Sequence, residues 1–306
     1  MPERIEGLVT AAHTPMHADG SLNLETIDRL ADAQAAAGVR GVFVCGTAGE
    51  GQSLTVAERK AVAERWRKAA GERILVIPHV GANCLADAKE LAAHAEAIGA
   101  DAMAAMAPSF SAPTRADTLA DFLAEIAAAA PRTPFYYYHL PSRTHVTVAA
   151  AALMRVAADR IPTFAGLKFT DYNLMDFGEC VRRAGDRLTV LFGRTEHLLA
   201  GLAMGAHGSI GGPYNSCAPL FLRLYRAYRA GDLAAARCAQ DKGRTFGIIT
   251  KRFGGLAALK AVMKMIGLDC GPSRLPLRNL TDEEFAVLRD ELRTIGFFDE
   301  CIGAPA

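Results

Sequence analysis

The strongest constraint on the fold is an alternation of short β-rich segments with longer Ala- and Leu-rich segments of helical period. Eight segments have the composition of strands: 8–14, 41–46, 74–81, 102–108, 134–141, 164–170, 188–193 and 206–211. Helical patterns lie between them, for example at 24–37, 55–70, 85–98 and 116–130. Eight such units predict the α/β class and a (β/α)8 TIM barrel in residues 1–215.

A doubly wound parallel sheet is the alternative for this alternation. That fold carries a Gly-x-Gly-x-x-Gly turn near its first strand, whereas segment 8–14 leads into HTPMHADG, and the glycine cluster at 46–51 has a different order. Residues 216–306 contain further helical patterns, at 218–230, 233–249, 256–266 and 282–294, and no strand candidate. They predict a C-terminal helical extension that packs on the barrel as part of one structural unit.

Charge and composition exclude several classes of protein. The 34 basic and 33 acidic side chains leave a net charge of +1, which argues against a nucleic-acid binder. No apolar run approaches the roughly 18 residues of a membrane span, and the start MPERIEGLVT lacks the apolar stretch of a signal peptide. The seven cysteines form no Cys-x-x-Cys pair, which fits reduced thiols. We therefore expect a cytoplasmic protein that binds neither nucleic acid nor membrane.

One lysine stands out among the basic residues, which comprise 26 arginines and eight lysines. Lys168 lies in an apolar β segment, where lysine is rare, whereas the other seven fall in helical patterns and need only a solvated or interface position. Inside a barrel, desolvation would lower its pKa from about 10.4 and supply a neutral amine that attacks a ketone. A lysine that reaches the rim or pairs with a carboxylate is the alternative.

Two further candidates lie at the carboxyl ends of predicted strands, where barrel enzymes carry their reacting groups. Tyr138 comes one strand–helix unit before Lys168, so it belongs on the neighbouring strand and could move protons beside an imine. Thr47 lies in a glycine-rich turn whose backbone N–H groups could hold a carboxylate. An ordinary aromatic strand and a tight loop are the alternatives for these two residues.

Histidines offer a different hypothesis. His13, His79 and His139 fall near the ends of three predicted strands, an arrangement that could hold a catalytic metal. No His-x-His pair occurs in the sequence, so the pattern contains no specific metal-binding motif. A metal-dependent barrel hydrolase is therefore a distant alternative, and we expect no metal.

Several short motifs together resemble one family over essentially the whole chain. They are GTAGEG at 46–51, YHLP at 138–141, GLK at 166–168, SIGGPYN at 209–215 and RLPL at 274–277. The chain resembles the pyruvate-dependent class I aldolases that include N-acetylneuraminate lyase and dihydrodipicolinate synthase. The stretches PFYYYHLP and IPTFAGLKFTD are most similar to the animal-type N-acetylneuraminate lyases.

This resemblance implies specific roles for individual residues. Lys168 would form a Schiff base with pyruvate or another 2-keto acid, and Tyr138 would relay protons. The carboxylate of the keto acid would be held by Thr47 with the backbone of Ala48. The pocket for the rest of the substrate would be lined by Thr170, Gly193, Glu196 and Gly211. The resemblance implies no metal or organic cofactor, and it suggests a homotetramer.

Departures from the family pattern bear on the substrate. Ala48 replaces the second hydroxyl residue of the loop, Thr195 stands where neuraminate lyases usually carry an aspartate, and Gly212 with Pro213 replaces Ser-Thr. Conversely, the segment around Arg143 resembles the synthase branch, in which that arginine meets a carboxylate of the incoming partner. Arg143 is therefore a candidate for binding a second substrate carboxylate, and a surface position is the alternative.

We predict a carbon–carbon lyase that acts on pyruvate and a 2-keto acid through an imine on Lys168, without a cofactor. Condensation of the dihydrodipicolinate synthase type and dehydration of a 2-keto-3-deoxy acid through the same imine are the alternatives. A keto-acid-binding protein without turnover is a more distant one. The expected partners are a small 2-keto acid and further copies of the same chain.

Overall fold

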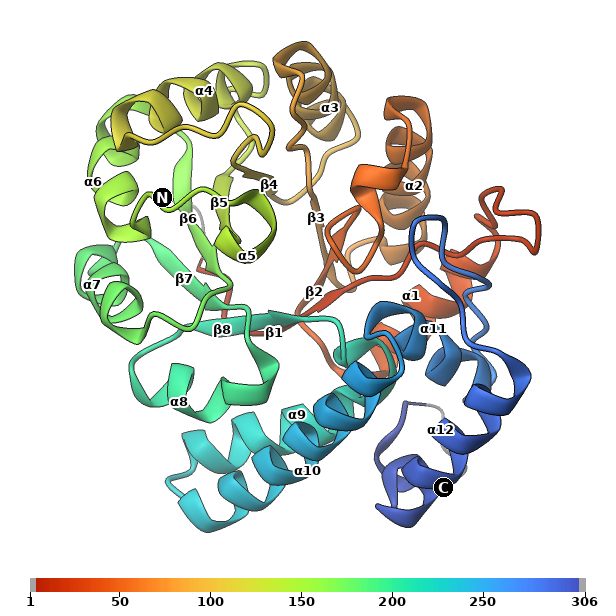
Figure 1. Ribbon diagram of the computed structural model, residues 1–306. Helices are drawn as coiled ribbons and strands as arrows, with labels where there is room; N and C mark the ends of the chain where they lie inside the picture. Colours follow the sequence, from red (N-terminus) through yellow and green to blue (C-terminus); the bar gives the residue numbers. More distant parts are fainter. Residues whose placement is uncertain (1–3, 303–306) are drawn as a thin grey trace.

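The computed structural model describes residues 4–302, and eight parallel strands form the centre of this part of the chain. The strands are β1 (Gly7–Ala11), β2 (Gly41–Val44), β3 (Leu75–Pro78), β4 (Met103–Met106), β5 (Phe135–His139), β6 (Phe164–Phe169), β7 (Thr189–Phe192) and β8 (Gly208–Gly211). Their order is β3-β2-β1-β8-β7-β6-β5-β4, and a parallel bridge between His79 and Ala104 brings β3 beside β4. The sheet thus closes into the predicted (β/α)8 barrel, seen along its axis in Figure 1.

Helices surround this barrel. The longer ones are α1 (Thr26–Ala37), α2 (Val56–Ala70), α3 (Leu85–Ala97), α4 (Ala116–Ala128), α6 (Ala150–Arg160), α7 (Leu174–Ala184), α8 (Leu198–Ala203) and α9 (Tyr214–Arg229). Three short helices lie in the loops after β2, β5 and β7: η1 (Gly51–Ser53), α5 (Pro141–Thr144) and η2 (Thr195–His197). These short helices are therefore at the carboxyl ends of the strands.

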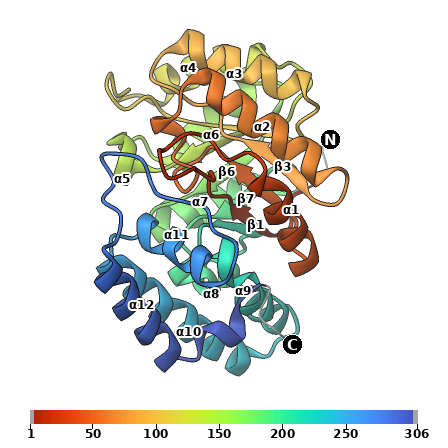
Figure 2. The same ribbon diagram turned by 90° about the vertical axis from the view of Figure 1, so that its right-hand side faces the viewer.

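The rest of the described chain forms the C-terminal extension. Its elements are α10 (Leu233–Arg252), α11 (Leu256–Met265), α12 (Asp282–Thr294) and η3 (Phe297–Glu300). They gather on one side of the barrel, where α10 and α11 pack on α9 (Figures 1 and 2). Position 215, at which the sequence analysis divides barrel from extension, lies inside α9, and that division stays a prediction. Across residues 4–302, no helix has both the length and the apolar character needed to cross a membrane.

Local sequence signals explain where helices begin and end. The Thr55 hydroxyl accepts a hydrogen bond from the Glu58 N–H, and the Glu58 carboxylate accepts one from the Thr55 N–H, which forms a capping box at the start of α2. Helix α1 ends at Gly38, whose φ of 83° lies in the left-handed region that favours glycine. These caps hold the barrel helices at fixed positions along the chain.

Alternation along β5 separates the inside of the barrel from its outside. Tyr136 and Tyr138 belong to the buried cluster within the barrel, together with Phe43 and Leu191. Tyr137 belongs to the cluster that packs between the strands and the outer helices. The phenol of Tyr138 is therefore directed into the barrel, as its spacing from Tyr136 predicts.

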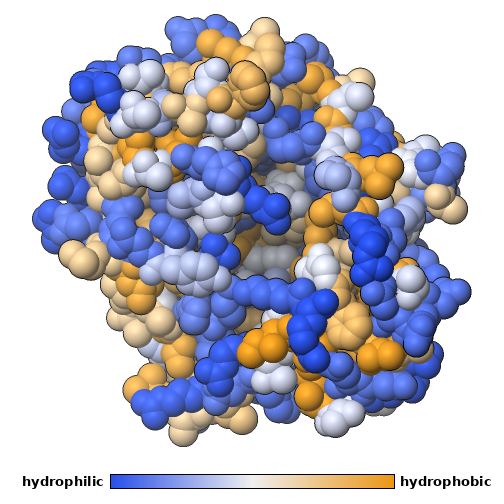
Figure 3. Space-filling view, in the orientation of Figure 1, coloured by the Kyte–Doolittle hydropathy of each residue, from blue (hydrophilic) through white to orange (hydrophobic). Residues whose placement is uncertain are grey.

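Seven of the eight strands end before the carboxyl ends of the predicted segments, and β8 ends at Gly211 as predicted. For example, β2 ends at Val44 and β7 ends at Phe192, so the residues that follow them form loops. These loops lie on the face that is turned toward the viewer in Figure 1. The same face is hollowed at its centre in Figure 3, with hydrophilic side chains around the hollow. In barrel enzymes this is the face that carries the active site.

Candidate active site

Lys168 points into the barrel because of an irregularity in β6. Ala165 faces the interior, and strict alternation would turn Lys168, three residues later, to the outside. The register between β5 and β6 shifts at Ala165, and the next residue, Gly166, has a φ of 146°. A Cβ on Gly166 would lie 1.9 Å from the carbonyl oxygen of Thr189, so only glycine fits there. The bulge thus returns Lys168 to the interior face.

Aromatic rings surround the amine of Lys168, which is 4% exposed. Its Nζ lies 4.0 Å from the ring centroid of Tyr138 and 4.3 Å from that of Phe43. Burial lowers the pKa of Lys168 from 10.5 to about 7. About half of these amines are therefore neutral at pH 7, and a neutral amine is the form that attacks a carbonyl.

Tyr138 lies directly opposite Lys168 in the register between β5 and β6. Its hydroxyl shares a hydrogen bond of 3.1 Å with the hydroxyl of Thr47, which lies in the loop after β2. Burial raises the pKa of Tyr138, against smaller opposing effects of this hydrogen bond and of the positive charges of Arg194 and Arg143. The phenol is therefore protonated at neutral pH. The fold brings Lys168, Tyr138 and Thr47 together.

The loop after β2, which carries Thr47, contains unused backbone donors. Within residues 4–302, the N–H groups of Thr47 and Ala48 donate no hydrogen bond. The carbonyl groups beside them are held, because His13 Nδ1 donates to the Ala48 oxygen at 3.1 Å and the Thr14 hydroxyl donates to the Gly49 oxygen at 2.7 Å. A turn that is fixed in this way, with two N–H groups unused, suits an anion.

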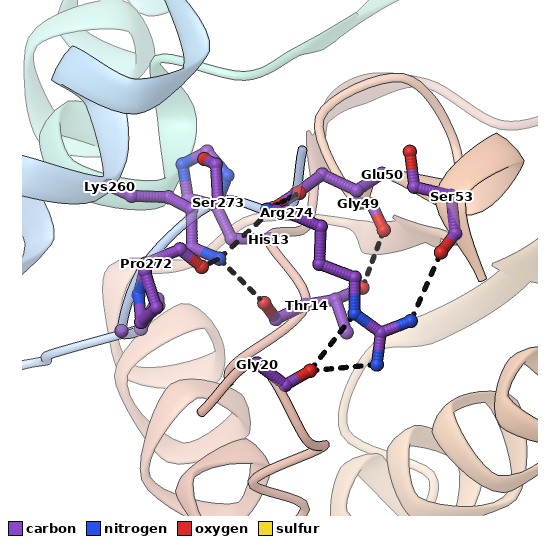
Figure 4. Close-up of polar contacts among 12 residues, drawn as sticks. His13, Thr14, Gly20, Gly49, Glu50, Ser53, Lys260, Pro272, Ser273 and Arg274 are labelled. Atoms are coloured by element: carbon purple, nitrogen blue, oxygen red, sulfur yellow. Dashed lines mark hydrogen bonds and ion pairs between the residues drawn. The ribbon is translucent and has the colours of Figure 1, made fainter. Parts of the chain in front are cut away.

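A buried ion pair from the extension holds the same loop. Lys260 Nζ in α11 lies 3.0 Å from Glu50 Oε1 and donates to the carbonyls of Thr14 and Pro272 at 3.1 and 2.6 Å (Figure 4). The second Glu50 oxygen accepts the backbone N–H of Arg274 at 2.8 Å. Both side chains of the pair are buried. The sequence predicts a solvated or interface position for Lys260, whereas the side chain is buried in this ion pair. The sequence does not reveal the pair, because no pattern relates α11 to the loop after β2.

Arg274, in the RLPL motif, makes a second connection between the extension and the barrel loops. Its guanidinium donates to the carbonyl of Gly20 at 2.8 and 2.9 Å and to that of Ser53 at 3.0 Å (Figure 4). It also pairs with Glu58 at 2.5 Å and holds the pKa of that carboxyl at about 2. The extension thus supports the loops beside the site as well as the outer helices.

Small side chains lie at the carboxyl ends of β6, β7 and β8. Thr170 follows β6 and is buried against Gly193, where an added Cβ would lie 2.0 Å from the Thr170 hydroxyl oxygen. Gly211 ends β8, and an added Cβ there would lie 2.2 Å from the methyl carbon of Thr195. Both glycines permit a close approach of neighbouring loops. The methyl group of Thr195 thus packs against the backbone of Gly211.

Comparisons with known proteins show the family of the chain. Residues 4–295 match the model of the Dihydrodipicolinate synthetase family. The chain belongs to this family. The N-acetylneuraminate lyase of Mus musculus is 42% identical over 300 residues, which cover 96% of this chain and 94% of that protein. The predicted enzyme class is thereby confirmed, since the chain is a carbon–carbon lyase of the class I aldolase type, similar to N-acetylneuraminate lyases.

Solved structures give the same picture of the family. Proteus mirabilis N-acetylneuraminate lyase has a TM-score of 0.93 at 37% identity, covering 96% of this chain and 100% of its own. Ruminococcus gnavus sialic acid aldolase, solved as a catalytic lysine mutant, has a TM-score of 0.90 at 29% identity, covering 96% and 98%. The barrel and its C-terminal helices are thus the fold of known aldolases.

Charged residues form the rim of this family member's site. Glu196 Oε1 accepts hydrogen bonds from the Tyr172 hydroxyl at 3.0 Å and from Lys251 Nζ at 3.3 Å. The guanidinium of Arg194 lies 4.1 Å above the ring of Tyr172 and 4.0 Å from Glu196. Arg143 is exposed on α5. Sequence reasoning named Glu196 and Arg143 and missed the other three, because no motif contains them.

The three histidines of the metal hypothesis are engaged in other contacts. His13 binds the loop after β2, and the two ring nitrogens of His79 each lie 3.3 Å from a nitrogen, that of the Arg59 guanidinium and that of the Met106 backbone. The ring of His139 packs 5.0 Å from that of Phe169. In the described part of the chain, no three His, Cys, Asp or Glu residues gather in an arrangement that could hold a metal ion.

Proposed function

We propose that the protein releases pyruvate from a 2-keto-3-deoxy acid through an imine on Lys168, with N-acetylneuraminate as the first substrate to test. The observation that carries this proposal is a buried, half-neutral amine next to a protonated phenol. The similarity to N-acetylneuraminate lyases and to an aldolase with a catalytic lysine supports it. The proposal fixes the chemistry at the keto end of the substrate.

The reaction begins when Lys168 Nζ attacks the C2 carbonyl, and loss of water leaves a protonated imine. Cleavage of the C3–C4 bond then sends its electron pair toward the imine nitrogen and forms an enamine. Tyr138 Oη gives its proton to the hydroxyl that departs as water, then takes the proton of the C4 hydroxyl and returns it to C3, so the aldehyde leaves without net change in protons. Water then releases pyruvate and regenerates the amine.

The other predicted site residues position the substrate in this proposal. The free N–H groups of Thr47 and Ala48, with the Thr47 hydroxyl, hold the carboxylate next to C2. Glu196 accepts hydrogen bonds from hydroxyl groups farther along the substrate. The wall between these two ends is lined by Thr170, Gly193 and Gly211.

Three further properties belong to the same proposal. The imine on Lys168 serves as the electron sink, so the reaction needs neither a metal nor an organic cofactor. The protein works as a homotetramer in the cytoplasm, where its seven free cysteines stay reduced. Light scattering on the purified protein measures the number of copies directly.

Trapping with borohydride tests the imine. The protein is incubated with pyruvate and sodium borohydride, and the modified peptide is located by mass spectrometry. We expect a reduced adduct on Lys168 and none on Lys260, a buried lysine that serves as the internal control. Release of pyruvate from N-acetylneuraminate is then followed with lactate dehydrogenase. An adduct elsewhere, or no adduct at all, contradicts the proposal.

A further inference from the structure

Arg194 occupies an unusual position at the rim of the barrel. It follows β7 directly after Gly193, and its guanidinium lies 4.1 Å above the ring of Tyr172, which follows β6. Its side chain is 18% exposed, so neighbouring residues cover most of it. Stacking on an aromatic ring holds an arginine side chain in one orientation while leaving its N–H groups available.

The N–H donors of Arg194 are unused. Within residues 4–302 its side chain donates no hydrogen bond, and its Nε is buried without a partner. The side chain of Arg143, after β5, makes no hydrogen bond or ion pair in the same range. Both charges lie near enough to the Tyr138 phenol to lower its pKa against the larger effect of burial. Two cations with free donors thus lie near the Tyr138 phenol.

The negative charges nearby are already in use. Glu196 lies 4.0 Å from Arg194, but its nearer partners are the Tyr172 hydroxyl and Lys251. The Asp171 carboxylate accepts the backbone N–H of Tyr172. Arg143, Arg194 and Lys251 therefore leave an excess of positive charge at this part of the rim.

The positions of Arg143 and Arg194 in the strand order place these cations beside the far end of a substrate. In the strand order, β6 lies opposite β2, so Lys168 faces the loop that presents the N–H groups of Thr47 and Ala48. Arg143 follows β5 and Arg194 follows β7, so they stand on the two sides of the lysine strand. A keto acid whose first carboxylate meets the loop after β2 has its remaining carbons on the side of these two arginines.

We propose that Arg194, held by Tyr172 and assisted by Arg143, binds a second carboxylate at the far end of the substrate. The preferred substrates are then 2-keto-3-deoxy diacids rather than acids that end in a neutral hydroxymethyl group. This inference rests on the proposed imine chemistry and names the substrate class. Thr195, in the loop after β7, is uncharged and so does not repel such a group, as an acidic residue there would.

The test compares matched substrates that differ only at the last carbon. One is a six-carbon 2-keto-3-deoxy acid with a terminal carboxylate, the second ends in a hydroxymethyl group, and the third carries a terminal phosphate. Pyruvate release gives kcat/KM for each of them. A pair of charge-assisted hydrogen bonds predicts a preference of about 10- to 100-fold for the carboxylate over the hydroxymethyl acid. A preference for the phosphate instead would overturn the choice of carboxylate.

Variants connect that preference to Arg194. R194L removes the preference, whereas R194K keeps the charge without the planar fork and retains only part of it. R143L lowers the preference by a smaller factor. The matched control is R187L, because Arg187 is exposed at the opposite end of the same strand. We expect R187L to leave both substrates unaffected.

Two outcomes would overturn the inference. One is a wild-type protein that cleaves the hydroxymethyl acid as well as the diacid, and the other is an R194L variant that loses both activities by the same factor. Pyruvate trapping on Lys168 separates these results from failure of the imine chemistry. If trapping succeeds without a diacid preference, the subsite is absent although the proposed function stands. If trapping fails in the wild type, the proposed function itself is wrong.

Discussion

The chain contains two buried lysines that are treated in opposite ways. Lys168 and Lys260 are 4% and 2% exposed. The amine of Lys260 lies within 3.1 Å of three oxygen atoms, which include the carboxylate of Glu50. The amine of Lys168 lies against the rings of Phe43 and Tyr138. One lysine is thus supplied with acceptors for its charge, while the other is placed where the charge is poorly accommodated.

This difference separates a structural lysine from a reactive one. A buried ammonium group needs a counter-charge and hydrogen-bond acceptors, which Lys260 has. Lys168 lacks a carboxylate partner among residues 4–302, so burial favours its neutral form. Destabilisation of the charged state is the condition that makes an amine nucleophilic at neutral pH. The two sites therefore predict mutational effects of opposite sign on stability.

Replacing Lys168 by Met gives the largest expected effect on activity. We expect pyruvate release to fall roughly 10⁴-fold or more, because no other group forms the imine. Stability should rise at the same time. Between pH 7 and 10.5 the folded protein binds fewer protons at Lys168 than the unfolded chain does. Because of this residue, the free energy of unfolding therefore decreases as the pH falls through that range. Urea unfolding at pH 7 should show a gain on the order of 3 kcal/mol.

That gain should shrink as the pH approaches 10, where the wild-type lysine is neutral in the folded state and its cost is largely gone. A stability of the Lys168→Met variant that equals the wild type at every pH would contradict the description of Lys168 as a poorly accommodated charge. Loss of stability would do so even more strongly.

Replacing Lys260 by Met should have the opposite effect. The change leaves Glu50 buried without its counter-charge, which costs about 3–5 kcal/mol in the free energy of unfolding. The loop after β2 also loses its link to α11, so the variant should bind pyruvate less tightly in the trapping assay. Urea unfolding and the pyruvate dependence of trapping measure the two effects.

The double variant with Glu50→Gln is the control for this interpretation. It removes the unpaired charge and keeps an acceptor for the Arg274 N–H, so much of the lost stability should return. A double variant as unstable as Lys260→Met alone would show that the cost comes from lost packing rather than from the ion pair.

The sequence alone indicates the unusual position of Lys168 but not that of Lys260. An apolar β segment around Lys168 marked that residue, and the spacing from Tyr138 placed the two on neighbouring strands, as the register confirms. Strict alternation, however, cannot give the phase of β6, because the bulge at Ala165 and Gly166 turns Lys168 inward. The register of β6 depends on the close contact between Gly166 and Thr189 of β7, which the local sequence does not reveal.

Contacts between distant segments account for the features that sequence reasoning missed. Lys260 and Glu50 are separated by 210 positions, and the GTAGEG motif that contains Glu50 does not indicate a partner in α11. Arg194 and Tyr172 meet only because the loops after β6 and β7 are neighbours in the barrel. Local periodicity predicts elements and their order, whereas these pairs depend on how loops close over the strand ends.

The smallest expected effect is the pH dependence of imine formation, and it tests the environment of Lys168 directly. With a pKa of about 7, the neutral fraction of Lys168 rises about tenfold from pH 6 to pH 8 and then levels off. The groups that face it keep their charge in this window, because burial raises the pKa of Tyr138 and lowers that of His79. Trapping of pyruvate with cyanoborohydride should therefore show one midpoint near pH 7.

A lysine with an ordinary pKa would instead give a rate that increases about tenfold per pH unit, without levelling off below pH 10. That result would place Lys168 with the solvated lysines of the helices and remove the contrast with Lys260.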